Sequence, residues 1–445
     1  MRDYALDSPE TLLGQLQRGL GRGFLASMRG RVGKDELLNC VLHDPRSDPQ
    51  LEERASYYAK LAIESELAVE AVAKAVRAAN AETVCAGLPA EVLMEMAVRG
   101  RNDALVALRE ELRQDGWLQA VLVMNHAEHQ YGHPLMESDD ITSIAGRDAE
   151  ELERIVVNLA HLPWQHWATS EPRLQTVMLA AHTEHKPSLR LPAGKPDTAM
   201  STSALLRIAE PRNAVRVVRV LAQRTDAASV ATMIAAGRGM DSNQRLAGLG
   251  ALGAQAHTGL LEYAAEVLEA AAGRARDVRT PAMLRYLEAL PPEATLPRAR
   301  QWLNQVGRAS VAAEHILARH ARTEDRELVE SSLANALEDD ATFRACSMVD
   351  ALTVIADSRS AEVLVQTFER LGYSRARPRV LRALERCCPE AVANLAIEAL
   401  WDCESEARRR GAHMTLITEE TSARLREIQG DMFEDERTRI AARRC

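Results

Sequence analysis

The feature that most constrains the fold of this chain is a repeat in its C-terminal half. In each repeat an Arg is followed by apolar residues at helical spacing, and the segment ends in Leu seven to nine residues later. Such segments begin at Arg212, Arg245, Arg279, Arg308, Arg344, Arg377 and Arg408. The steps between them are 33, 34, 29, 36, 33 and 31 residues. A period near 33 residues with two helices per period is typical of arrays whose units bury their apolar faces by stacking.

Between the Arg-led segments the sequence predicts a second set of helices. Their expected ranges are Ala227–Ala236, Leu260–Ala271, Arg298–Val306, Arg326–Leu337, Ala361–Leu371 and Glu390–Trp401. We therefore expect an all-α fold, and specifically an α-solenoid, which is a superhelix of antiparallel helix pairs.

The best-defined repeat resembles a HEAT repeat. Residues Pro389–Leu416 have a proline that opens the first helix, an acid at the turn (Asp402), and Ala407–Arg408 opening the second helix. Residues Leu337–Leu352 repeat the acidic turn and the Arg. The resemblance implies that Asp and Arg side chains interact at the turns of adjacent repeats. It covers a little over half of the chain.

The chain is predicted to divide into three parts. Residues 1–185 form an N-terminal helical domain, residues 186–202 a Pro-rich linker or long loop, and residues 203–445 the repeat array. Ser8–Pro9 and Asp48–Pro49 are each interpreted as a cap that opens a helix. Further helices are expected at Val69–Ala79, Ala90–Val98, Asp103–Gln114, Leu118–Asn125, Asp148–Leu162 and Arg173–His182.

Composition restricts the class of protein. Aromatic residues make up only 4% of the chain, which favours helix over sheet. The N-terminus lacks the apolar core of a signal peptide, and no apolar stretch is long enough to span a membrane. Seven scattered Cys without a CxxC pair indicate a reducing compartment. We therefore expect a cytoplasmic protein that does not bind a membrane.

Histidine is the one clustered residue type that could carry metal chemistry. Seven of the twelve His fall between His126 and His185. His126 and His129 have i, i+3 spacing, and His182 and His185 repeat it, which suits metal ligation from one helix face. Gly132 and Pro134 are expected to end the first helix before His133, so the alternative of surface or capping histidines stays open. No cofactor or metal is therefore predicted, and these four His are weak candidates.

A polar and aromatic cluster near residue 50 is a candidate partner-binding edge. It contains Arg46, Asp48, Glu53, Tyr57 and Tyr58. Exposed Tyr and Arg are common at protein interfaces. The alternative is a Pro-rich turn followed by a capped helix.

Two further aromatic residues, Trp164 and Trp167, follow Pro163 and are candidates of the same kind. Their alternative role is to anchor the end of a helix.

An Arg-rich segment at the start of the array is a candidate phosphate-binding strip. Arg212, Arg216 and Arg219 are expected to share a helix face, with Arg245 further along. Some HEAT-like proteins are alkylpurine DNA glycosylases that grip duplex DNA in a basic groove. The sequence pI near 5.8 argues against that class, and an Arg face that is partly paired and solvated is the alternative.

The function predicted from these patterns is that of a non-enzymatic scaffold. Its concave surface would hold a protein or peptide partner, because stacked helix pairs form an extended surface. Residues 1–200 contain 30 acids and 21 Lys or Arg, which favours a partner with a basic face. Nucleic-acid binding through the Arg-rich strip is the first alternative, and a metal-dependent function at the His cluster is the second.

Overall fold

The protein is described by a computed structural model. It covers residues 5–30, 33–78, 87–132, 134–147, 152, 169, 171–184, 198–271 and 279–443. The described residues contain α-helices and short 3₁₀ turns but no strand, which confirms the all-α class for this part of the chain. None of the described helices combines the length and apolar content needed to cross a bilayer.

The helices follow one another with short connections. The N-terminal helices are α1 (Leu12–Arg18), α2 (Gly21–Gly30), α3 (Lys34–Leu42), α4 (Arg54–Glu64), α5 (Val69–Ala78), α6 (Leu88–Val98), α7 (Asn102–Glu111), α8 (Trp117–Tyr131), α9 (Ser138–Ala145) and α12 (Pro172–Glu184). The next are α13 (Thr202–Arg207), α14 (Ala214–Leu221), α15 (Ala227–Arg238), α16 (Ser242–Ala254), α17 (Leu261–Ala270), α18 (Thr280–Ala289), α19 (Pro292–Trp302), α20 (Arg308–His320), α21 (Arg326–Glu338) and α22 (Thr342–Ile355). The last are α23 (Ala361–Arg370), α24 (Arg377–Cys387), α25 (Pro389–Ala399), α26 (Ser405–Met414), α27 (Glu419–Gly430) and α28 (Glu436–Ala442).

Every helix predicted in the repeat region is present. The seven Arg-led segments correspond to the even-numbered helices α14 to α26, and the intervening predictions correspond to the odd-numbered helices α15 to α25. The largest error is at α19, which begins at Pro292 rather than near Arg298. Pro is favoured in the first turn of a helix, where its missing N–H has no intrahelical partner, and this signal was overlooked.

Two predicted helix starts in the N-terminal half are wrong by several residues. The cap of α1 is Thr11, whose side chain accepts a hydrogen bond from the Gly14 N–H, and Ser8–Pro9 lies in the preceding turn. Likewise α4 begins at Arg54, because Asp48–Pro49 opens a tight turn in which the Asp48 carbonyl accepts from the Leu51 and Glu52 amides. The predicted end of α8 is confirmed, since Gly132 terminates it with a positive φ of 73°. The predicted helix Asp148–Leu162 and most of the predicted linker lie outside the described residues.

Contacts between Cα atoms divide the chain into two compact units. Unit 1 comprises residues 1–187, 366–381 and 390–445, and unit 2 comprises residues 188–365 and 382–389. Segments 366–381 and 390–445, which the sequence places in the repeat array, thus group with the N-terminal helices in this division.

In unit 2 the helices pack on their second neighbours as well as on their sequence neighbours. Helices α14, α16, α18, α20 and α22 contact one another in succession. Their intervening helices pack alongside, as in the pairs α15–α16, α19–α20 and α21–α22. Glycine permits one of these close approaches, because a Cβ atom at Gly248 in α16 would lie 2.9 Å from the Met233 carbonyl oxygen of α15.

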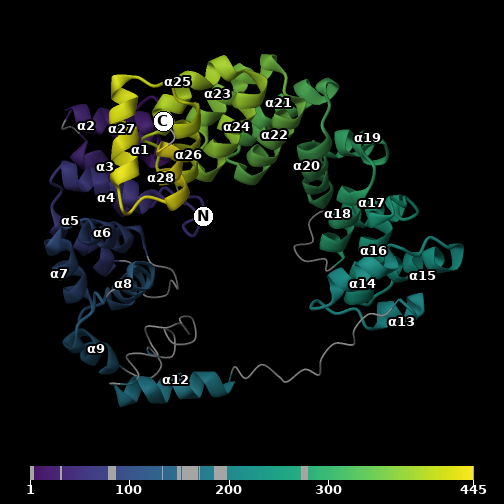
Figure 1. Cartoon of the computed structure of the whole chain (residues 1–445), viewed down its shortest axis with the longest axis horizontal. Helices are drawn as coiled ribbons and strands as arrows, with labels where there is room; N and C mark the ends of the chain where they lie inside the picture. Colours follow the sequence, from purple (N-terminus) through teal and green to yellow (C-terminus); the bar gives the residue numbers. More distant parts are fainter. Residues whose placement is uncertain are drawn as a thin grey trace. The chain divides into compact units, whose positions relative to one another are not determined.

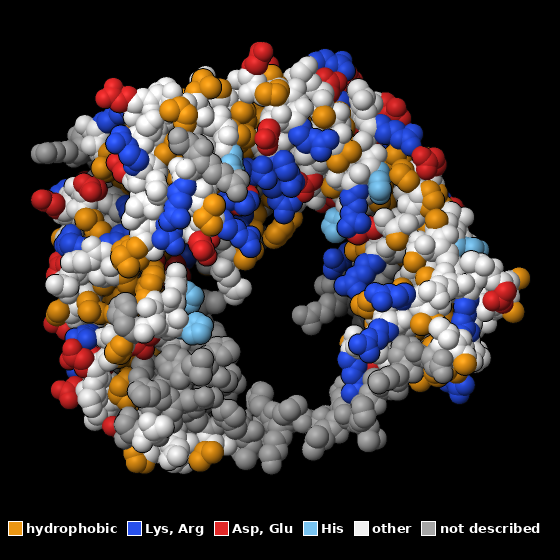
Figure 2. Space-filling model, viewed as in Figure 1, with side chains coloured by type: hydrophobic (Ala, Val, Ile, Leu, Met, Phe, Trp, Pro, Cys, Tyr) orange, Lys and Arg blue, Asp and Glu red, His pale blue; other side chains and the backbone are white. Residues whose placement is uncertain are grey.

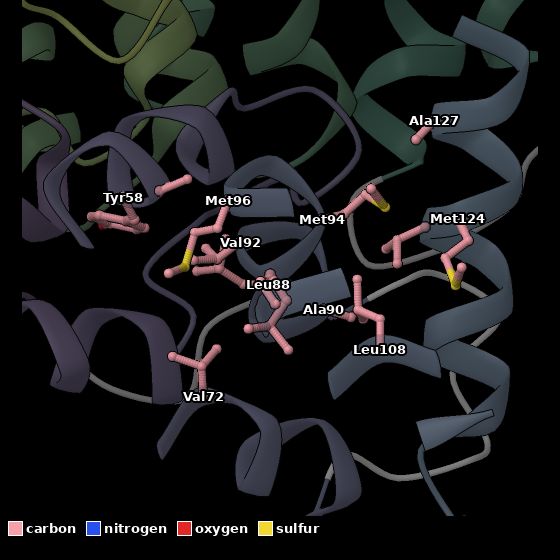
Figure 3. Packing of buried hydrophobic residues seen from close by; sticks show 14 of the residues in the cluster. Tyr58, Val72, Leu88, Ala90, Val92, Met94, Met96, Leu108, Met124 and Ala127 are labelled. Atoms are coloured by element: carbon pink, nitrogen blue, oxygen red, sulfur yellow. The ribbon is translucent and has the colours of Figure 1, made fainter. Parts of the chain in front are cut away.

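Unit 1 has one apolar core to which both ends of the chain contribute. In the N-terminal part, α6 packs against α4, α5, α7 and α8, and Figure 3 shows Met94, Val92 and Leu88 of α6 among the residues that pack there. The same cluster includes Leu400, Trp401 and Leu425 from the C-terminal segment. The yellow helices α26 to α28 are drawn in the same region of Figure 1 as the purple helices, and Lys60 of α4 pairs with Asp431, which follows α27, at 2.7 Å.

The two chain ends meet at a backbone junction that requires glycine. The amide of Cys403 donates to the Gly19 carbonyl at 3.0 Å. Gly19 has a φ of +66°, and a Cβ atom there would collide with Cys403 Sγ. At Gly21 a Cβ would collide with the carbonyl oxygen of Glu398. Glycine is therefore required both for the turn between α1 and α2 and for this close approach.

Buried ion pairs surround the junction. Arg377 donates to both carboxylate oxygens of Asp402, at 2.5 and 2.9 Å, and also to the Gly19 carbonyl at 3.2 Å. Arg54 donates to Glu52 at 3.0 Å and to the carbonyls of Gln17 and Gly372. The side chains of both pairs are completely buried. Each charge is thus withdrawn from water and depends on its partners.

Glu404 is the acid of this network that is least stabilised as an anion. Burial, together with the nearby charge of Glu53, raises the pKa of Glu404 to about 7. The Ser374 hydroxyl lies within hydrogen-bond distance of both Glu404 and Glu52, yet it has one proton to donate. A proton on Glu404 resolves this conflict, because Ser374 can then donate to Glu52 and accept from Glu404.

Removing the negative partner of Arg377 should destabilise unit 1 strongly. In Asp402→Asn the guanidinium stays buried without a counter-charge, so we expect a loss of about 3–5 kcal/mol in the free energy of unfolding. Hydrogen exchange of unit 1 amides in increasing urea measures this loss. The matched control is Asp103→Asn, which removes a more exposed pair with Arg101 in the same unit and should cost about 0–1 kcal/mol. Equal losses in the two variants would contradict the assigned importance of the buried pair.

Glu404 should make the stability of unit 1 depend on pH. Its pKa is about 7 in the folded chain against an ordinary value of 4.5, so the folded state binds the extra proton between these values. The stability that this extra proton gives to the folded state is therefore fully present below about pH 4.5 and is lost as the pH rises through about 7. Glu404→Gln, which mimics the protonated acid, should remove this slope from urea unfolding measured between about pH 5 and 8. An unchanged slope in the variant would show that other groups cause it.

Candidate functional site

Helix α14 in unit 2 presents two arginines that the fold does not use. Val217 and Leu221 are fully buried and fix the orientation of the helix. Arg216 and Arg219 lie on the exposed side, and among the described residues neither has an ion-pair or hydrogen-bond partner. Val215, one turn before Arg219 on this side, is 73% exposed. The predicted pairing of Arg216 and Arg219 on one face therefore agrees with their placement.

The other two members of the predicted Arg strip differ in position. Arg212 precedes α14 and pairs with Glu210 at 2.7 Å. Arg245 is buried within α16, where it donates to the carbonyls of Gly239 and Met240 at 3.1 and 2.7 Å. It thus holds the turn between α15 and α16, and its side chain is withdrawn from the surface. The structure does not place Arg245 beside Arg216 and Arg219.

A second group of cations lies on α18 and α20. His315 Nδ1 is 2.6 Å from one oxygen of Glu288, and Arg319 is 3.4 Å from the other. The hydrogen bond to Glu288 raises the pKa of His315, and His315, Arg319 and Arg285 lower the pKa of Glu288. One carboxylate therefore faces two arginines and a histidine that readily takes up a proton, which leaves an excess of positive charge.

Together these side chains form an exposed basic surface on unit 2. We call Arg216, Arg219, Arg285 and Arg319 the arginine strip; all four are exposed. Figure 2 shows Lys and Arg side chains gathered over α14, α18 and α20. Other arginines of unit 2 are used between helices: Arg344 pairs with Glu314 at 2.8 Å. The strip is thus distinct from the ion pairs that join the helices.

The candidate edge near residue 50 is largely internal to unit 1. Tyr57 and Tyr58 are buried, and their hydroxyls donate to the carbonyls of Leu20 and Leu16, each at 2.8 Å. These rings anchor α1 and α2 against α4. In this conformation neither ring is available to a partner.

Three polar residues of the same edge also serve unit 1. Arg46 is buried between Asp44 and Glu91, at 2.7 and 2.6 Å. Glu53 accepts from the Ser405 amide at 2.9 Å, at the start of α26. Asp48 is half-buried and accepts from the Gln50 amide. Asp48 and Glu53 remain partly accessible, and for these two residues a role in binding a partner stays a prediction.

The remaining candidates are only partly described. His126 and His129 are exposed on α8. The side chain of His182, together with His185, Trp164 and Trp167, lies outside the described residues. Within the described part of the chain, no group of three or more His, Cys, Asp or Glu is arranged to hold a metal ion.

Arg285, Arg319 and His315 were missed by the sequence reasoning. That reasoning looked for a basic surface only among Arg212, Arg216, Arg219 and Arg245. In α16 and α22 the first Arg of the repeat instead contacts the preceding turn or helix, as Arg245 and Arg344 do. The exposed cations lie further along the helices. The signal that would have found Arg285 and Arg319 is a second Arg later in α18 and α20.

The buried Arg245 and the exposed Arg216 should respond differently to substitution. Arg245→Met leaves two carbonyls of the α15–α16 turn without donors, so we expect unit 2 to lose about 1–3 kcal/mol of stability. Arg216→Met alters an exposed side chain and should stay within about 0.5 kcal/mol of the wild type. Urea unfolding followed by hydrogen exchange in α15 and α16 measures both. A destabilised Arg216→Met would mean that this arginine has a structural role.

Comparisons with known proteins leave the chain without an assigned relative. No family model matches it, and no match was found among curated proteins or among solved structures. The resemblance to HEAT repeats therefore depends on the sequence pattern given above.

Proposed function

We propose that the chain is a non-enzymatic scaffold that holds a protein or peptide partner on unit 2, along the surface of α14, α18 and α20. The observation that carries this proposal is the arginine strip, since Arg216 and Arg219 are exposed and lack counter-charges among the described residues. Charged groups that a fold does not pair are available to bind a partner of opposite charge.

The packing of unit 2 supports the same proposal. Helices α14, α16, α18, α20 and α22 contact one another in succession, and this pairing is the one expected of a HEAT-like solenoid. In such an array the helices of one layer form a continuous surface that suits an extended partner. We include the solenoid arrangement in the proposal.

The acidity of the N-terminal half is a weaker guide to the partner. Glu52, Glu111, Glu128 and Asp140 are buried. Glu111 pairs with Arg77 at 2.6 Å, and Glu128 accepts from the amides of Leu135 and Met136. Part of this negative charge is therefore used inside unit 1. A partner with a basic face, held by unit 1, stays a prediction.

Site-specific crosslinking in the cells of origin tests the proposal. The photoreactive residue p-benzoylphenylalanine replaces Val215, which is 73% exposed within the strip, and in a control chain it replaces Val306, which is 90% exposed in the loop before α20. We expect one protein to be crosslinked at Val215, in a roughly equimolar adduct, and not at Val306. Adducts that are spread over many proteins, or equal at both positions, would contradict the scaffold function.

Nucleic-acid binding is the second candidate, favoured by the same unpaired Arg216 and Arg219. Its test is a salt titration of duplex DNA or RNA binding. If both arginines contact phosphates, Arg216→Ala with Arg219→Ala should reduce the slope of log K against log salt by about 2. Absence of binding at low salt would remove this candidate.

A further inference from the structure

We infer that the partner segment is an acidic peptide with aliphatic side chains among its carboxylates, and that it docks on α14 at Val215, Arg216 and Arg219. This inference rests on the proposed function and names the chemistry of its partner. The docking surface extends over the rest of the arginine strip, to Arg285 and Arg319.

The placement of three side chains on α14 carries the inference. Arg216 and Arg219 are three residues apart, which places them about one turn from each other on the same side of the helix. Val215 is four residues before Arg219 and shares that side. An exposed aliphatic side chain thus lies one turn before the guanidinium of Arg219 and next in the sequence to Arg216. A peptide with carboxylates about one turn apart and an aliphatic residue beside them is complementary to this arrangement.

Arginine suits carboxylates in particular. Its planar guanidinium donates two parallel hydrogen bonds to one carboxylate. Inside the protein the same geometry occurs between Arg377 and Asp402. Among the described residues Arg216 and Arg219 have no such acceptor, so a bound peptide would supply one for each.

Three observations favour a peptide over a nucleic acid. The carboxylate of Glu288 lies between the cations of α18 and α20 and would repel a continuous row of phosphates. Val215 offers an apolar contact, for which a phosphate backbone has no counterpart. The chain also has a formal net charge of −9, which opposes association with a long polyanion.

Fluorescence anisotropy of labelled probes with the full chain tests the inference. The first probe is a peptide with Glu and Leu on one helix face, and the second has the same number of Glu but Gly in place of Leu. The third is duplex DNA. We expect the Glu-Leu peptide to bind most tightly, with an affinity that falls as salt is added.

Two variants locate the binding surface. Arg216→Glu with Arg219→Glu should weaken the Glu-Leu peptide at least about 30-fold, because two attractive contacts become repulsive. Val215→Ala should weaken it about threefold, through lost apolar contact. The control, Arg238→Glu with Arg359→Glu, makes the same change in net charge at two exposed arginines outside the strip. It should alter the affinity by no more than about twofold.

Four outcomes would overturn the inference. They are no binding of the Glu-Leu peptide, equally tight binding of the Glu-Gly peptide, tighter binding of duplex DNA, and an equal loss in the control variant. The last would indicate that net charge alone governs binding.

The crosslinking experiment separates this inference from the scaffold proposal. If the same protein is crosslinked at Val215 with and without Arg216→Glu and Arg219→Glu, the scaffold function stands and the acidic-peptide inference falls. If no protein is crosslinked while the peptide binds as expected, the strip has the inferred chemistry but the scaffold function fails.

Discussion

The buried ion pair between Arg377 and Asp402 is the interaction on which unit 1 most depends. Arg377 also donates to the Gly19 carbonyl, so one guanidinium joins the turn after α1 to the loop before α26. A charge withdrawn from water is stable only while its partners stay in place. The close approach in turn requires glycine at positions 19 and 21. The two ends of the chain are thus held by an arrangement that tolerates little change.

Arginine has two opposite roles in this protein. In unit 1, Arg54 and Arg377 are buried and their hydrogen bonds link segments that are distant in the sequence. In unit 2, Arg216 and Arg219 project into solvent without a described counter-charge. The first use stabilises a junction at the expense of desolvating the ions. The second leaves the ions hydrated and available to a ligand, which is why the functional proposal concerns unit 2.

The aromatic residues of α4 are a weak guide to function because, like the buried arginines, they serve the fold. Tyrosine is common at protein interfaces, but the hydroxyls of Tyr57 and Tyr58 donate hydrogen bonds to the carbonyls of Leu20 and Leu16. A buried tyrosine needs such a partner, and here the partners come from α1 and α2. The interface that these residues form is therefore internal to unit 1.

The sequence by itself determined most of the described helices. The period of the apolar residues located all thirteen repeat helices from α14 to α26, because helical periodicity is a local property. The sequence also identified Arg216 and Arg219, because their spacing of three residues on one helix is enough to place both on the same face. Only the tertiary structure decided that Arg245 is buried, that Arg285 and Arg319 cluster about Glu288, and that residues 390–445 group with the N-terminal helices. These outcomes depend on which surfaces meet, and pairs such as Glu53 with Ser405 join residues hundreds of positions apart that no local pattern connects.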